Sequence, residues 1–188
     1  MIIALAGRRI DASDAEITRF PLHDAALVRE RVYQFLIHRK ATALVCSAAC
    51  GADLLALDVA GELGIERYII LPFAQDRFRT ASVTDRPGEW GTLFDRITKE
   101  VQAAKHLMVL SEPDEDNNIF ITTNKVILDK ALTIAQQAIH NKREQAANSV
   151  LAVLVWDGQS RGQDDLTANF ADEARMRGIP VFEITTVK

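Results

Sequence analysis

The sequence is poor in the features that mark several large classes of protein. Its 188 residues include two cysteines and 6% aromatic residues, and its formal net charge is −4. Without an excess of basic residues, a nucleic acid is not expected as the main partner. No apolar run is long enough to cross a bilayer, and the apolar run at 1–6 leaves no room before it for the charged and apolar regions of a targeting segment, so we expect none. We therefore expect a cytoplasmic protein with no membrane partner.

Metal-binding and redox motifs are also missing. Cys46 and Cys50 lack the CxxC spacing of redox sites, so they are interpreted as small buried side chains. No HxxxH or HExxH pattern joins the histidines, which are His23, His38, His106 and His140. We expect neither a metal nor a cofactor.

Three motifs of nucleotide and ester chemistry are absent as well. The sequence contains neither GxGxxG, nor the phosphate-binding GxxxxGK[ST], nor GxSxG. Their absence disfavours redox chemistry with NAD, hydrolysis of nucleoside triphosphates by a P-loop, and serine esterase chemistry.

What the sequence does contain is a regular alternation of apolar runs and helical patterns. Strands are expected at 1–6, 43–45, 67–71, 106–110, 150–156 and 179–184. Helices with one apolar face are expected at 23–39, 89–102 and 118–140, and also after Gly51 and from Leu166. The alternation predicts one α/β domain over residues 1–188, with a doubly wound, mostly parallel Rossmann-like sheet of about six strands and helices on both faces.

The stretch 46–53, CSAACGAD, joins an expected strand to an expected helix. A turn of this kind leaves backbone N–H groups at the positive end of a helix dipole, which suits a phosphate. Ser47 adds a hydroxyl, and Gly51 permits close approach of a ligand to the backbone. The alternative is an ordinary capped turn without a ligand.

Other unusual loops also follow expected strand ends. They are Gly7–Asp11, Pro72–Trp90, Asn118–Asn124 and Trp156–Thr167. Because the carboxyl ends of parallel strands meet at one edge of a sheet, we expect these loops to form one nucleotide-shaped site there. The predicted ligand-binding residues are Gly7, Arg8, Arg9, Asp11, Ser47, Ala48, Gly51, Ala52, Asp53, Pro72, Phe73, Phe78, Arg79, Ser82, Trp90, Asn124, Trp156, Asp157, Gly162 and Thr167.

Two polar segments stand out between the expected helices. The segment 74–89 is read as a long loop that mixes cations with aromatic rings, which can contact phosphate and stack on a base. We interpret it as a lid over a ligand, with an ordinary surface excursion as the alternative. The acidic segment 111–118 is expected at the rim, because it would repel a polyanion passing over it.

The order and spacing of these pieces resemble the SLOG superfamily, whose relatives include the cytokinin-activating LOG enzymes and the DNA-processing protein A family. The resemblance runs nearly end to end. It is carried by GRRID at 7–11, SAACGAD at 47–53, LPF at 71–73 with Phe78 and 82–83, Trp90 with Phe94, and WDG at 156–158 followed by Gly162 and Thr167. Several SLOG groups are implicated in sensing nucleotide-derived signals in bacterial conflict systems. The resemblance implies a stand-alone sensor domain for such a ligand, with an effector protein as its partner.

One departure from the LOG pattern concerns catalysis. LOG enzymes carry PGGxGTxxE, whose glutamate assists N-glycosidic cleavage, whereas this sequence reads RGQDDLTANF at 161–170. The second glycine and the glutamate are missing, so Asp157 and Glu173 are the carboxylates left for that role. A nucleotide N-glycoside hydrolase or transferase is therefore the alternative to a binding module. Protein association, as a homo-oligomer through a helix face, is a third hypothesis.

Overall fold

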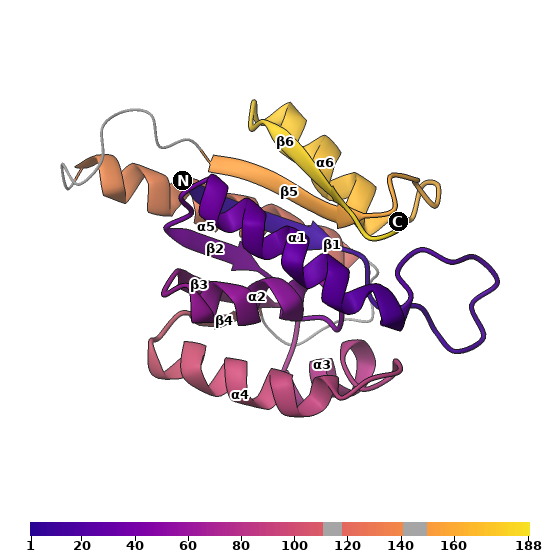
Figure 1. Cartoon of the computed structure of the whole chain (residues 1–188). Coiled ribbons are helices and arrows are strands. Elements are labelled where there is room, and N and C mark those ends of the chain that lie inside the picture. The colour runs from indigo at the N-terminus through magenta and orange to yellow at the C-terminus, as the bar shows by residue number, and fades with distance from the viewer. Residues whose placement is uncertain (111–117, 141–149) are drawn as a thin grey trace.

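The computed structural model describes residues 1–110, 118–140 and 150–188, so the predicted acidic segment 111–118 lies outside the described residues except for its last residue. Among these residues, six strands form one sheet in which all pairs are parallel (Figure 1). The strands are β1 (Ile2–Gly7), β2 (Ala43–Cys46), β3 (Glu66–Leu71), β4 (Leu107–Val109), β5 (Val150–Trp156) and β6 (Val181–Thr185). Their order across the sheet is β4-β3-β2-β1-β5-β6. The predicted doubly wound α/β fold is confirmed.

Helices cover both faces of the sheet. They are η1 (Leu22–Asp24, a 3₁₀ turn), α1 (Ala25–His38), α2 (Ala52–Glu62), α3 (Gln75–Ser82), α4 (Trp90–Ala103), α5 (Asn118–His140) and α6 (Leu166–Met176). Side chains of α1, α2 and α4 share one hydrophobic core with Ile3 and Leu5 of β1. Side chains of α5 and α6 share a second core with Ile2 and Ala4 of the same strand. The sheet is thus the middle layer of three.

The composition of β1 and β5 explains why they lie inside the sheet and not at its edges. Successive side chains of a strand point to opposite faces, and both faces are covered here, so both sides of each strand must be apolar. Every residue of β5 from Val150 to Val155 is buried. β1 pairs with β5 over six positions, from Ile2 with Val150 to Gly7 with Val155.

The chain changes direction across the sheet between β1 and β5. From β1 the strands proceed outward through β2 and β3 to β4, and the chain then returns to the other side of β1 for β5 and β6. In doubly wound sheets, such a reversal opens a crevice at the carboxyl ends of the two strands. That edge is where the sequence predicts a site.

Two predicted boundaries need correction. The segment 74–89, predicted to be a long irregular lid, contains helix α3, which buries Phe78 and Ser82 against the core. The helical periodicity of α3 is hard to detect in the sequence, because most of its eight residues are polar. The fourth strand is also shorter than predicted, since His106 lies before β4 and stacks on Tyr68 with ring centroids 4.0 Å apart.

A close approach between two loops fixes the edge of the sheet. Gly51 precedes α2 with a φ of 93°, and a Cβ added there would lie 2.9 Å from the carbonyl oxygen of Arg8. The next residue, Ala52, donates its N–H to that same carbonyl at 3.1 Å. A glycine is therefore required both for its backbone conformation and for the lack of a side chain.

We expect Gly51→Ala to lower the free energy of unfolding by about 3 kcal/mol or more, because strain and overlap add. Gly178→Ala is the matched control. Gly178 also has a positive φ of 69°, yet nothing lies within 4 Å of its added Cβ, so its cost is only about 1 kcal/mol. Urea unfolding of both variants measures the difference, and equal losses would contradict the close approach.

Candidate functional site

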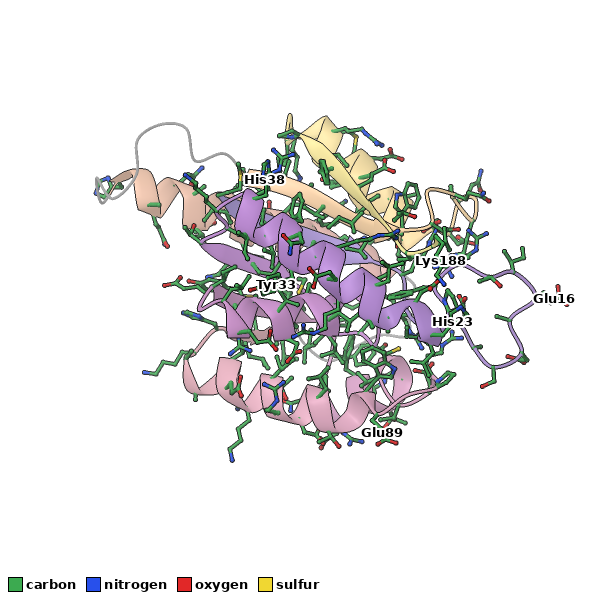
Figure 2. All side chains as sticks on the ribbon, in the orientation of Figure 1. Glu16, His23, Tyr33, His38, Glu89 and Lys188 are labelled. Atoms are coloured by element: carbon green, nitrogen blue, oxygen red, sulfur yellow. The ribbon has the colours of Figure 1, made fainter. Side chains whose placement is uncertain are left out.

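A cavity of about 770 Å³ opens at the carboxyl edge of the sheet, beside the point where the strand order reverses. Its walls come from the ends of β1 and β2, the first turns of α2, α5 and α6, helix α3, and the loop between β1 and η1. That loop projects from the body of the domain, and Glu16 lies at its outer end (Figure 2). The volume is in the usual range for a small-molecule site.

The cavity brings together residues from all five of the predicted loops. Ten predicted residues line it: Gly7, Arg8, Arg9, Asp11, Ser47, Asp53, Phe78, Ser82, Asn124 and Thr167. Six other residues of the lining have polar or aromatic side chains and were not predicted: Glu16, Arg19, Arg86, Phe120, Thr123 and Arg161. Arg86, Phe120, Thr123 and Arg161 lie within the predicted loops, whereas Glu16 and Arg19 follow the first of them. Nothing in the sequence alone separates these six residues from solvated surface residues.

The other predicted residues lie behind the cavity wall or bond elsewhere. Arg79 pairs with Asp95 through two hydrogen bonds of 2.8 and 3.0 Å. Trp90 is buried and donates its ring N–H to the carbonyl of Pro87 at 2.8 Å. The residues outside the lining are Ala48, Gly51, Ala52, Pro72, Phe73, Arg79, Trp90, Trp156, Asp157 and Gly162.

Arg8 forms the buried ion-pair network at one end of the cavity. Its guanidinium donates to both carboxylate oxygens of Asp165, at 2.7 and 2.8 Å, and to Asp157 at 3.0 Å. It also donates to the carbonyl of Gln159 and lies 5.4 Å from the ring centroid of Trp156. Arg8 is only 2% exposed. Its donors are thus used within the protein, and its predicted role as a phosphate ligand becomes a structural one.

Asp165 is the partner that ties this network to helix α6. It caps the helix by accepting from the N–H groups of Thr167 and Ala168, and it also accepts from the N–H of Arg161 at 2.7 Å. Burial alone would raise its pKa. Hydrogen bonds from Arg8 and from backbone N–H groups outweigh burial and lower the pKa of Asp165 to about 2.

The turn between β2 and α2 differs from the predicted phosphate cradle. Much of its N–H capacity is already used: Ala49 donates to Asp53, Cys50 to the carbonyl of Ser82, and Ala52 to the carbonyl of Arg8. The side of Gly51 that a Cβ would occupy faces the backbone at 8–10. The prediction that several outward N–H groups remain unpaired here is therefore wrong for these positions, and the turn's main contributions to the cavity are the side chains of Ser47 and Asp53.

Asp53 is a carboxyl at the cavity wall with an unusual proton affinity. It is 7% exposed, and one of its oxygens accepts from the N–H of Ala49 at 3.2 Å. Burial raises its pKa to about 7, although the N–H of Ala49 and the charge of Arg9 oppose the rise. Near neutral pH this side chain therefore exchanges between a charged acceptor and a neutral donor.

Two comparisons with known proteins yield no relative, because neither any protein-family model nor any curated protein sequence matches the chain. Within 1–110, 118–140 and 150–188, no helix is long and apolar enough to span a membrane. The same residues hold no group of three or more His, Cys, Asp or Glu side chains that could bind a metal ion. The cavity is therefore the feature of this chain that indicates a function.

Asp53→Asn is expected to stabilise the protein at high pH. Between about pH 4 and pH 7 folded Asp53 holds a proton that the unfolded chain releases, so this residue's contribution to the free energy of unfolding falls as pH rises. Asparagine has no proton to lose. Its advantage over aspartate should widen by about 2–3 kcal/mol from pH 5 to pH 8.

Urea unfolding at the two pH values measures this change. Asp76→Asn, on the exposed side of α3, is the control and should shift by less than about 0.5 kcal/mol. A gap between Asp53→Asn and the natural protein that stays constant with pH would show that Asp53 has an ordinary pKa.

Proposed function

We propose that the domain binds a nucleotide or nucleotide-derived small molecule in this cavity and acts as a sensor for it. The single observation that carries the proposal is the position and size of the cavity. About 770 Å³ lies at the carboxyl edge of a parallel sheet, where the strand order reverses. This place in doubly wound folds is well suited to phosphate-containing ligands, because strand ends and helix N-termini converge there.

The lining supplies chemistry for each part of such a ligand. Phe120 offers an aromatic ring on which the base of a nucleotide can stack. Asn124, in α5, donates its amide N–H to the carbonyl of Leu166 at 2.8 Å, which orients its amide oxygen as an acceptor for a hydroxyl. Five arginines and three acidic residues also line the cavity. The donors of Arg8 are used within the protein, so the other arginines are the partners available to an anionic group.

Binding is favoured over hydrolysis of an N-glycosidic bond. The two carboxylates proposed for that reaction are held in ion pairs: Asp157 bonds to Arg8 and Arg19, and Glu173 bonds to Arg177 at 2.8 Å. Neither belongs to the cavity lining. A catalytic acid or base must reach the reacting bond, and these two side chains do not extend to the cavity.

In this proposal an effector protein in the cytoplasm recognises whether the domain has bound its ligand. The resemblance to nucleotide-sensing domains of bacterial conflict systems supports such a role. Self-association of the domain is compatible with it, since a sensor can transmit occupancy through a helix face.

A panel of mononucleotides, dinucleotides and cyclic nucleotides tests the proposal through the melting temperature. At a concentration a hundredfold above its Kd, a ligand adds about 2.7 kcal/mol to the free energy of unfolding. We expect at least one panel member to raise the melting temperature of the natural protein. Ser47→Trp, which places a large ring in the cavity, should lose that response.

Thr133→Trp, on the exposed face of α5, is the matched control and should keep the response. The unliganded melting temperatures of both variants report whether they fold. If no panel member stabilises the natural protein, the proposed function is wrong.

A further inference from the structure

We propose that Arg9 and Arg86, with Asp85 between them, form the anion subsite of the cavity, and that Asp53, which lines the same cavity, influences how tightly the anion binds. This inference rests on the proposed function for the identity of the anion, which would be a phosphate group of the ligand. The subsite itself is argued from the arrangement of these four side chains.

The two arginines share one carboxylate. Arg9 donates to Asp85, and Nε of Arg86 lies 3.5 Å from the same carboxylate oxygen. Both arginines line the cavity, and their side chains are 30% and 29% exposed. Two guanidinium groups against one carboxylate leave a surplus positive charge at the cavity wall, where solvent and a ligand can reach it. Such a surplus attracts an anion.

Unused hydrogen-bond donors lie at the same place. The Nε atoms of Arg9 and Arg86 are sealed from solvent and make no hydrogen bond with a described residue, and the 3.5 Å approach of Arg86 Nε to Asp85 is an ion pair without hydrogen-bond geometry. A buried donor without an acceptor costs free energy. A tetrahedral oxyanion carries several acceptor oxygens, and guanidinium groups bind such oxygens in pairs. An anion in the cavity would supply the missing acceptors when the two side chains turn toward it.

The surplus charge depends on the protonation of Asp53. The charged group that acts on Asp53 is Arg9, and Asp53 itself acts on the buried thiol of Cys46. Arg9 also interacts with the thiol of Cys50 and with Asp85, whose other partner is Arg86. Burial raises the pKa of both thiols, so they remain neutral near pH 7. When Asp53 is protonated, the two arginines and Asp85 carry one net positive charge.

When Asp53 ionises, the same cluster becomes neutral overall. The ionised carboxylate of Asp53 then acts on Arg9 in addition to that of Asp85 and repels an anion, so the anion binds less tightly. By linkage, a bound anion in turn favours the proton on Asp53. The other charged residues that line the cavity are Arg8, Asp11, Glu16, Arg19 and Arg161.

An anion subsite at Arg9 and Arg86 also determines which way a nucleotide would lie in the cavity. Its phosphate would lie beside the end of α3, near Ala81 and Arg86, and not over the turn at 46–53. The sugar and base would extend toward Asn124 and Phe120 of α5. A ligand bound this way does not depend on the backbone N–H groups of the turn, of which those of Ala49, Cys50 and Ala52 are already bonded.

Sulfate is a suitable probe, because it stays doubly charged between pH 6 and pH 8. We expect isothermal titration of the natural protein at pH 6 to give saturable sulfate binding, at an ionic strength held constant with sodium chloride. Arg86→Gln should weaken this binding about tenfold or more, since it removes a charged donor. Arg79→Gln is the matched control, because Arg79 pairs with Asp95 outside the cavity and should leave binding unchanged.

The pH dependence separates the role of Asp53 from that of the arginines. Sulfate affinity of the natural protein should fall about threefold or more from pH 6 to pH 8. Asp53→Asn should bind sulfate equally at both values and more tightly than the natural protein at pH 8. Equal pH dependence in the two proteins would remove Asp53 from the proposal.

The two proposals can fail separately. Absence of saturable sulfate binding, or equal binding by Arg86→Gln, overturns the anion subsite even if a nucleotide binds elsewhere in the cavity. Sulfate binding that requires Arg86, combined with no response to any nucleotide, keeps the subsite and overturns the nucleotide. Circular dichroism of each variant confirms that it is folded, so that a lost signal reports on binding.

Discussion

The structure depends on the buried ion pair between Arg8 and Asp165. It joins the end of the central strand β1 to the first turn of α6, which lie 157 residues apart in sequence. Removing either partner would leave a buried charge unpaired, which typically costs 3–5 kcal/mol. The pair therefore links the two sides of the reversal in strand order, at an edge where Arg8 also lines the cavity.

Much of the fold could be predicted because its signals are local. The run at 150–156 is apolar at nearly every position, and it forms the strand that was expected. Helix α3 was missed because eight mostly polar residues show little periodicity, and it is the buried ring of Phe78 that secures it. The tertiary packing that stabilises such a short helix is not encoded in its own sequence.

The candidate site could be predicted in position but not in detail. Parallel strands bring their following loops to one edge, so ten of the predicted residues line one cavity. Sequence cannot tell which arginine is already paired: Arg8 lies in the network with Asp157 and Asp165, whereas Arg9 shares its partner Asp85 with Arg86. Nor can it show that Asp53 is buried, which is what raises the pKa of that carboxyl.

The central claim is that the ligand's anionic end lies at Arg9 and Arg86. Selenate has the shape and charge of sulfate, and its selenium atom can be located by anomalous scattering in a soaked crystal. The account predicts a selenium peak within hydrogen-bonding reach of both guanidinium groups. A peak over Ser47 and Gly51 instead, with the arginines unoccupied, would contradict it.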